Sequence, residues 1–522
     1  MALTRREALT AALGGAALPA GAAAARGRGP EGQRCADLGD GRYLNPIVPG
    51  DHADPTVLKD GADYYLSFSS FAATPGAVIW HSRDLFNWVP ITAALPEPPG
   101  TVWAMDLVRH QGRYFLYIPV LQAQGTAVYV VWADDIRGPW SAPIDLGLPG
   151  CIDPGHVVGE DGRRYLFLNG GRRVRLSDDG LRTDGPLQEG AWEAWRYPED
   201  WVVEMFAPEG PKLLRHGGWF YLVSAVGGTA GPPTSHMVTL SRSRSVHGPW
   251  EHCPHNPIVR TRSADEPWWS RGHASLVEGP AGDWWMVYHG YENGFRTLGR
   301  QALLEPVAWT RDGWLRARGG TLSRPLPAPR GGQAGPTGLA LSDDFERPTL
   351  GLPWSLHGAA PGELAQRVQV GGGELRLRGK GQALADCSPL CCVVGDHRYE
   401  VTVEVEAHGA AHGGLALFYD ERGHAGIGLG GGELLTYGYG QEQRWMRQPL
   451  TTPRLHLRLL NRDNVLTWFR SADGRQWQQL PWQMEVSGLH HNVFGGFTSL
   501  RLALFSAGEG ELRFRRLRYR AL

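Results

Sequence analysis

Hydrophobic and polar positions between residues 43 and 320 follow a pattern that recurs five times. Each copy opens on an acidic residue or a histidine, continues as a short apolar strand, turns at a glycine and returns as a strand rich in aromatic residues, as in DPTVLKDGADYYLSFSS from residue 54. This arrangement predicts one β-hairpin per copy. The opening residues, 47 to 64 positions apart, are Asp54, Asp106, Asp153, Glu209 and His273.

A second strand-turn-strand pattern follows four of the copies, for example AVIWHSRDLFNW and AVYVVWADDIRGPW. Two hairpins per copy make a four-stranded antiparallel sheet, and radial repetition of such sheets makes a β-propeller. We therefore predict a five-bladed propeller over residues 40–323. The alternative is a β-sandwich with five unrelated hairpins, which the common phase of the copies disfavours.

The rest of the chain reads as a linker and a second β domain. Residues 324–341 are rich in proline and glycine, which is typical of a linker. Strands with period-two alternation, such as YEVTVEVEA and ELRFRRLRYR, occur within residues 342–522. One-sided polarity of this kind favours a β-sandwich, so the predicted fold class is all-β throughout.

Composition narrows the possible functions. Hydrophobic residues make up 42% and charged residues 20%, which excludes a wholly disordered chain. The net charge of -1 offers no basic field for nucleic acid. The six cysteines form no pair of CxxC motifs and are too few for a disulfide scaffold, so they indicate neither a zinc site nor a stapled fold.

The first 25 residues predict an export signal. Arg5 and Arg6 precede an apolar, alanine-rich run that ends near Ala25. A basic start followed by a short apolar stretch is typical of a secretory signal, and paired arginines indicate the twin-arginine route. We expect a periplasmic or extracellular protein with no stable membrane insertion; the alternative is a disordered alanine-rich tail.

The five opening residues are the candidate functional site. In a propeller, the innermost strand of each blade runs along the central channel, so these residues are expected to share one rim. Clustered carboxylates repel one another and are costly to desolvate. Such a cluster therefore indicates a ligand, a metal or a reaction that uses it.

Six short motifs in this order resemble glycoside hydrolase family forty-three, particularly its β-xylosidases and α-L-arabinofuranosidases. The family is an inverting one, in which a general base activates water and a general acid protonates the leaving oxygen. The resemblance implies that Asp54 is the base, Glu209 is the acid, and Asp153 raises the pKa of Glu209. The motifs are His52-Ala53-Asp54-Pro55, Trp103-Ala104-Met105-Asp106, Ile152-Asp153-Pro154, Pro208-Glu209-Gly210-Pro211, Gly272-His273-Ala274 and Leu298-Gly299-Arg300.

The same resemblance implies the residues that bind the substrate. Arg300 would hold the sugar, while Phe71 and Trp103 would pack against its ring. Asp106 would either contact sugar, or hold Arg300 or the channel network. Ala73 stands where the family often has a bulkier aromatic residue, which implies a more open pocket wall.

No cofactor is expected to be required, although the resemblance allows a structural calcium ion in the channel. His273 would lie beside such an ion and contact it through water. The alternative for His273 is a hydrogen-bonded core histidine. Any such cation should be held mainly through oxygen atoms.

Cys387-SPLCC and the strands after it resemble the lectin-like, concanavalin-like sandwich attached to many β-xylosidases of this family. In those enzymes the sandwich packs on the propeller and can lend a loop to the pocket. The alternative is an independent carbohydrate-binding module.

The main functional hypothesis is an inverting, exo-acting hydrolase. It would release xylose or arabinofuranose from hemicellulose-derived oligosaccharides or side chains. One alternative is another furanosidase or a galactosidase on the same fold; a fructan-cleaving enzyme would show Asn-Asp-Pro-Asn and Glu-Cys, where this chain has Ala53-Asp54-Pro55-Thr56 and Glu209-Gly210. The other alternative is a non-catalytic, sugar-binding propeller.

Overall fold

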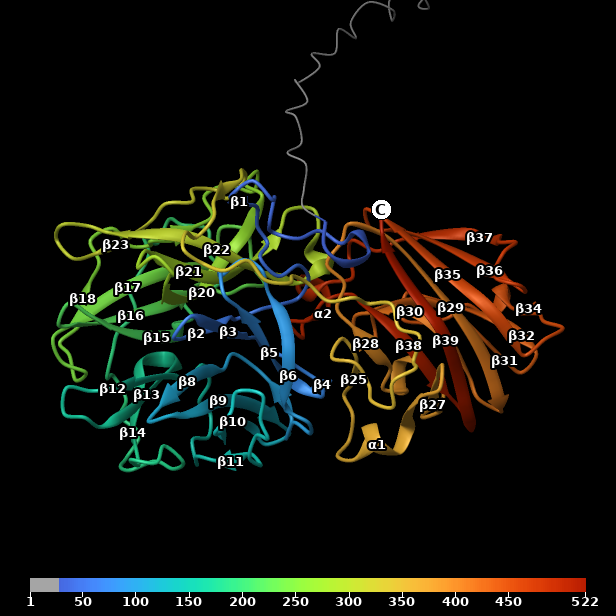
Figure 1. Ribbon diagram of the computed structural model, residues 1–522, viewed down its shortest axis with the longest axis horizontal. Helices are drawn as coiled ribbons and strands as arrows, with labels where there is room; N and C mark the ends of the chain where they lie inside the picture. The colour runs from blue at the N-terminus through green and yellow to red at the C-terminus, as the bar shows by residue number, and fades with distance from the viewer. Residues whose placement is uncertain (1–27) are drawn as a thin grey trace, which may run out of the picture.

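Each repeated pattern forms one blade of a propeller, and the second β domain forms a sandwich beside it (Figure 1). The computed structural model describes residues 28–522, so the predicted signal at residues 1–25 lies outside the described residues. The predicted fold class, a five-bladed propeller followed by a sandwich, is confirmed. Within residues 28–522, no helix has both the length and the apolar character needed to cross a membrane.

The innermost strands of the five blades close a ring around the channel. Strand β2 contacts both β8 and β20, β8 contacts β12, and β15 contacts both β12 and β20. The repeat openers Asp106 and Glu209 begin their strands, whereas Asp54 and Asp153 lie two residues before theirs. These innermost strands are β2 (Thr56–Asp60), β8 (Asp106–His110), β12 (Gly155–Val158), β15 (Glu209–His216) and β20 (Trp268–Glu278).

The outer strands pair antiparallel within each blade, mostly in chain order. Blade one adds β3 (Asp63–Ser67), β5 (Gly76–Ser82) and β6 (Val89–Leu95); blade two adds β7 (Thr101–Val102), β9 (Arg113–Gln122), β10 (Gly125–Ala133) and β11 (Ile144–Asp145). Blade four adds β16 (Trp219–Val226), β17 (Met237–Ser243), β18 (Glu251–His252) and β19 (Val259–Arg260); blade five adds β21 (Trp284–Glu292), β22 (Arg300–Trp309) and β23 (Leu315–Ala317).

Blade three departs from the predicted four strands. It contains β12, β13 (Arg164–Leu168) and β14 (Arg172–Leu176), and the returning segment makes only isolated bridges, among them Arg173 to Gln188. That segment contains Gly185 and Pro186, and proline has no amide hydrogen to donate to a ladder. Blade five also differs from expectation, because it has a second hairpin that the sequence pattern did not reveal.

The segment predicted as a linker, residues 324–341, lies along the propeller. Its strand β24 (Leu326–Pro327) pairs with β1 (Arg42–Tyr43) outside the blades. The Gly338 amide donates to Trp88 O, and Gln33 Nε2 donates to Leu339 O. The segment is therefore hydrogen-bonded near both of its ends to the propeller and to the chain that precedes it.

The sandwich consists of two antiparallel sheets with a shared hydrophobic core. The first sheet contains β25 (Ser355–His357), β28 (Leu390–Cys392), β30 (His412–Phe418), β31 (His424–Gly430), β32 (Glu433–Gly438), β33 (Gln441–Glu442), β34 (Gln448–Pro449) and β38 (Arg501–Ala507). The second contains β26 (Val368–Gly371), β27 (Glu374–Arg378), β29 (Arg398–Gly409), β35 (Arg454–Arg462), β36 (Val465–Ser471), β37 (Gln478–Glu485) and β39 (Gly510–Ala521). Two short helices, α1 (Glu363–Arg367) and α2 (His491–Phe494), interrupt the strands.

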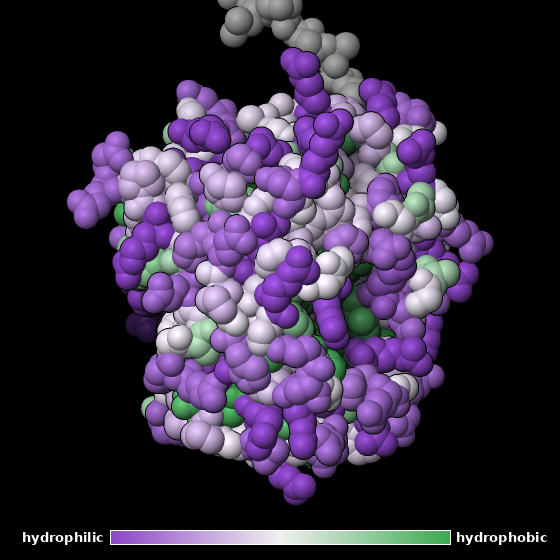
Figure 2. All heavy atoms as spheres, turned by 90° about the vertical axis from the view of Figure 1, so that its left-hand side faces the viewer, coloured by the Kyte–Doolittle hydropathy of each residue, from purple (hydrophilic) through white to green (hydrophobic). Residues whose placement is uncertain are grey.

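The two domains share one sheet edge. Strand β4 (Ala73–Thr74) belongs to the propeller chain but pairs with β25 of the sandwich. Helix α2 lies where the two domains meet (Figure 1), and Asn492 Nδ2 donates to Ala230 O of blade four. On the propeller side of the molecule, the surface is largely hydrophilic, and hydrophobic residues are visible in one hollow (Figure 2). The pairing of β4 with β25 therefore fixes the sandwich against the propeller, beside the segment that carries Phe71.

Candidate active site

Asp54 is held as a charged carboxylate at the start of blade one. Arg300 Nη1 donates to Asp54 Oδ1 at 2.7 Å, and Ser69 Oγ donates to Asp54 Oδ2 at 2.6 Å. Burial alone would raise the pKa of Asp54, but the charges of Arg300 and His273 outweigh burial and hold this pKa well below its usual range. Asp54 is therefore ionised at neutral pH, as a general base must be.

Glu209 has the opposite charge state. Burial and the neighbouring Asp153 carboxylate raise the pKa of Glu209 from 4.5 to about 8. Its side chain remains 25% exposed, so the carboxyl group is open to an incoming molecule. Glu209 therefore carries a proton at neutral pH and is able to donate it.

Asp153, the acid of blade three, contacts residues of blades four and five. Its Oδ2 accepts the Gly210 amide hydrogen at 3.0 Å and lies 3.4 Å from His273 Nε2. Asp153 and Asp54 have φ values of 55° and 57°, a conformation that non-glycine residues rarely adopt. Strained backbone of this kind concentrates at functional sites, where the surrounding contacts maintain it.

Three histidine rings stack beneath the acids. The His236 and His289 rings lie 5.3 Å apart, and the His273 ring lies 5.9 Å from His289. Burial lowers the pKa of His236 to about 4 and also holds the pKa of His289 low. Burial opposes charge on His273 too, but the Asp54 and Asp153 carboxylates outweigh it and raise its pKa.

The residues around His273 offer few direct ligands for a metal ion. The buried His273 Nδ1 has no hydrogen-bond partner, which leaves one free nitrogen there. Calcium prefers six to eight oxygen ligands. Among residues 28–522, no group of three or more His, Cys, Asp or Glu side chains is placed to hold a metal.

Aromatic rings form the walls above the acids. The Arg300 guanidinium lies 5.8 Å from the Phe71 ring and 5.4 Å from the Phe497 ring. Trp103 meets Phe497 edge-on, with their ring centroids 6.4 Å apart. Phe71 and Trp103 were expected here, whereas Phe497 comes from the sandwich. The propeller and the sandwich thus build the pocket together.

The loop that carries Phe497 is braced by neighbouring contacts. The Phe497 ring stacks on His491 with centroids 4.0 Å apart, and the Phe497 amide donates to His491 Nδ1. The Leu500 amide donates to Thr297 O of the propeller at 2.8 Å. No sequence pattern identified this loop, because the pocket residues that Phe497 meets, Arg300 and Trp103, lie about 200 and 400 residues away along the chain.

Asp106 lies in the channel network rather than beside Arg300. Its Oδ1 accepts a hydrogen bond from Lys212 Nζ at 2.8 Å, and its Oδ2 accepts from the His156 amide at 2.7 Å. These bonds favour the second of the two interpretations of Asp106. Ser69 and His289, which both contact Asp54, were not singled out from the sequence.

Ala73, expected to open one pocket wall, is part of the edge strand that pairs with the sandwich. Glu204, five residues before Glu209, is exposed. Its Oε2 accepts the Gly231 amide hydrogen at 2.8 Å. Glu204 therefore does not belong to the central group of acids.

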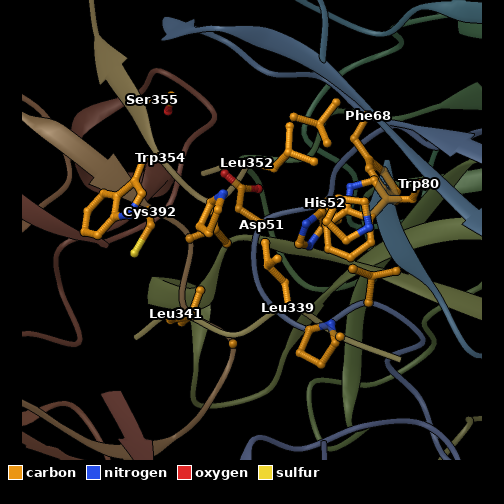
Figure 3. Close-up of a pocket in the computed structure, with 18 of the residues that line it drawn as sticks. Asp51, His52, Phe68, Trp80, Leu339, Leu341, Leu352, Trp354, Ser355 and Cys392 are labelled. Carbon is orange, nitrogen blue, oxygen red and sulfur yellow. The ribbon is translucent and has the colours of Figure 1, made fainter. Parts of the chain in front are cut away.

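A separate cavity of about 400 Å³ lies between the domains. Figure 3 shows Asp51 and His52 projecting toward it among apolar side chains that include Leu339 and Leu352. Burial raises the pKa of Asp51 to about 7, and its Oδ1 accepts the Arg300 amide hydrogen. Asp54, Asp153 and Glu209 do not line this cavity, but Ser69 and Phe71 do, so it borders the pocket above the acids.

The arrangement places one ionised carboxylate and one protonated carboxyl group in the same pocket. Two carboxyl groups whose environments separate their pKa values are the usual acid-base assignment in a glycosidase. Arg300 keeps the base charged, and burial together with the Asp153 charge keeps the acid neutral. The site can therefore accept a proton from water and give another to a leaving oxygen.

Comparisons with known proteins agree with this geometry. Residues 43–315 match the family described as Glycosyl hydrolases family 43, and residues 342–519 match the Beta xylosidase C-terminal Concanavalin A-like domain. A xylan 1,3-beta-xylosidase from a Vibrio species is 30% identical over 423 residues, which span 73% of this chain and 78% of that protein. A non-reducing end alpha-L-arabinofuranosidase from Bacteroides ovatus is 31% identical over 354 residues, or 65% of each protein.

A solved structure extends the likeness to nearly the whole chain. The GH43 BlXynB protein from Bacillus licheniformis superposes with a TM-score of 0.81 at 26% identity, covering 92% of this chain and 100% of that one. The family match spans more than half of this chain. The resemblance found in the six motifs is confirmed, and the chain belongs to glycoside hydrolase family 43.

Proposed function

We propose that this glycoside hydrolase removes single xylose or arabinofuranose residues from the ends or side chains of hemicellulose-derived saccharides, with inversion of configuration. Asp54 takes a proton from a water molecule on one face of the sugar. Glu209 gives its proton to the leaving oxygen on the other face. The substrate is therefore an oligosaccharide or a polysaccharide.

The observation that carries the proposal is the opposite charge state of the two acids. Asp54 stays ionised beside Arg300, whereas Glu209 holds its proton up to about pH 8. Sugar binding alone needs no such separation, because a lectin site does not transfer protons. This argues for hydrolysis over a non-catalytic, sugar-binding role.

Removal of one sugar at a time is supported by the pocket walls. Phe71 and Trp103 come from the propeller, and Phe497 reaches in from the sandwich. Aromatic faces close to Arg300 suit a single ring that packs against them while its hydroxyl groups contact the guanidinium. A wall contributed by a second domain shortens the open groove that an endo-acting enzyme needs.

Xylose and arabinofuranose are proposed from the relatives. One relative is named a xylan 1,3-beta-xylosidase and another a non-reducing end alpha-L-arabinofuranosidase. Both names describe release of pentose residues. The pocket of this chain contains Asp54, Trp103 and Arg300, which belong to the motifs that resemble the family.

The reaction is proposed to need no cofactor, because the proton transfers use carboxyl groups alone. Residues 1–25 support export by the twin-arginine route. A test of both points is retention of activity after exhaustive chelation, and recovery of the protein outside the cytoplasm only while Arg5 and Arg6 are intact.

Hydrolysis of a panel of nitrophenyl glycosides tests the proposal. We expect turnover of the β-xyloside, the α-L-arabinofuranoside or both, and much weaker turnover of galactosides. Asp54→Asn, purified in parallel, should lose nearly all activity, which excludes a contaminating enzyme. Absence of turnover with every glycoside, together with sugar binding, would support the non-catalytic alternative instead.

A further inference from the structure

Lys212 places a cation in the channel directly below the catalytic acids. Its Nζ donates to Asp106 Oδ1 and Met105 O at 2.8 Å, and to Pro154 O at 2.9 Å. An ammonium group has three hydrogens to donate, so these three bonds satisfy it completely. The Lys212 and Asp106 side chains are only 8% and 9% exposed.

A local irregularity turns Lys212 toward the channel. In a regular strand, residues three apart point to opposite faces, so Glu209 and Lys212 could not both face inward. The register of β15 against β16 shifts between these two residues, and Gly210 adopts a φ of 59°. Such a bulge redirects side chains, and here it gives both residues access to the channel.

The three acceptors of Lys212 belong to two other blades. Met105 and Asp106 come from blade two, Pro154 leads into blade three, and Lys212 itself comes from blade four. The set of one carboxylate and two backbone carbonyl groups consists entirely of oxygen atoms. Hard cations bind such oxygen sets, and here the cation is covalently part of the chain.

The bond to Pro154 acts next to the strained residue Asp153. Lys212 fixes the carbonyl group one residue after Asp153, and Asp106 fixes the amide of His156 at 2.7 Å. The strand that follows Asp153 is thus tied at two successive points to the Lys212–Asp106 pair. A left-handed φ of 55° persists in a non-glycine residue only when its surroundings impose it.

Blade one offers an internal comparison. Asp54 has a similar φ of 57° and is also followed by proline, but Pro55 O accepts a hydrogen bond from the neutral Ser275 hydroxyl at 2.9 Å. For both strained acids, a side chain from another blade therefore donates a hydrogen bond to the carbonyl group of the following residue. Only the donor behind Asp153, the Lys212 ammonium group, carries a charge.

We propose that Lys212 is a positioning residue and the built-in cation of the propeller channel: through Pro154 O and Asp106 it holds Asp153 where Asp153 sets the proton on Glu209. Lys212 touches neither the sugar pocket nor the reacting atoms. Its loss should therefore lower kcat and leave KM nearly unchanged. The kinetic part of this inference rests on the proposed function.

Lys212→Ala tests the inference, with Lys59→Ala as the matched control. Lys59 lies near the end of β2, the innermost strand of blade one, and its Nζ is 3.5 Å from Glu278 Oε1, with the Lys59 side chain 30% exposed. We expect kcat of Lys212→Ala on a nitrophenyl xyloside or arabinofuranoside to fall about 100-fold, the cost of a small misplacement in an active site. Methylammonium, which replaces the lost ammonium, should restore at least one tenth of the wild-type kcat. Lys59→Ala should keep the wild-type kcat and show no response to methylammonium.

Thermal melting gives a second readout that does not depend on catalysis. If Lys212→Ala is too unstable for kinetics, methylammonium should still raise its melting temperature and leave that of Lys59→Ala unchanged. A response in melting together with an inactive wild-type enzyme would reject the proposed function but keep the cation site. A Lys212→Ala protein with wild-type kcat, or one that responds to methylammonium in neither measurement, would overturn the inference.

Discussion

The Arg300 guanidinium lies 2.7 Å from Asp54 Oδ1, and this contact keeps the carboxylate that we propose as the general base charged. Both side chains are buried, at 5% and 7% exposed. Removing one partner from a buried ion pair leaves an uncompensated charge. The pair therefore has two roles, since Arg300 also forms part of the pocket wall beside Phe71 and Phe497.

Arg300→Met should impair catalysis through Asp54. Without the guanidinium, burial dominates and the pKa of Asp54 rises, so the acidic limb of the pH profile should move to higher pH. We expect kcat/KM at neutral pH to fall by about 100-fold or more. Arg300→Lys keeps a positive charge and should leave the acidic limb closer to its wild-type position. An unmoved acidic limb in Arg300→Met would contradict this role.

Asp153→Asn should move the opposite limb. Glu209 is active while protonated, so activity is lost as the pH rises through its pKa of about 8. The Asp153 charge raises that pKa, and its removal should shift the basic limb of kcat/KM to lower pH by about one unit. Measuring kcat/KM from pH 5 to pH 10 checks this. A shift to higher pH would mean that Asp153 acts in some other way.

Glu209→Gln should show a dependence on the leaving group. Natural glycosides have poor leaving groups that need a proton, so their hydrolysis should fall by about 100- to 10,000-fold. Dinitrophenyl glycosides need little protonation and should lose far less. Comparing kcat for the two substrates in the same preparation separates this effect from misfolding. Equal losses would remove Glu209 from the role of general acid.

Phe497→Ala tests the contribution of the sandwich to the pocket. The variant loses one aromatic wall near Arg300 and Trp103, so KM for a monosaccharide glycoside should rise by about 3- to 10-fold. Val493→Ala is the matched control, because Val493 lies in α2, four residues before Phe497, but is 61% exposed. An unchanged KM in Phe497→Ala would show that the sandwich does not contact the sugar.

The three main acids were predictable because each opens a local repeat. Asp54, Asp153 and Glu209 stand at equivalent positions of hairpins, and a hairpin can be recognised from a short stretch of sequence. Propeller geometry then brings the equivalent positions to one rim. Arg300 was found through its motif, and the structure bonds it directly to Asp54.

The residues that were missed act across long separations. Phe497 reaches the pocket from the other domain. Strand β4 joins that domain's sheet, but with two residues it is too short to show an alternation of hydrophobic and polar positions. Lys212 is three positions after Glu209, where regular alternation would point it away from the channel; only the bulge between them reverses this. In blade three, Pro186 interrupted a pairing that the repeat had predicted. Local pattern therefore indicated the acids, and tertiary contacts supplied what surrounds them.

Proton NMR of the first turnover tests the central claim most directly. If Asp54 activates water while Glu209 protonates the leaving oxygen, water attacks the face opposite the leaving group, and the first sugar released has the inverted anomeric configuration. The spectrum should show that anomer first, with the other growing only by later mutarotation. Initial release of the retained anomer would require a covalent intermediate on the enzyme and would contradict the roles assigned to Asp54 and Glu209.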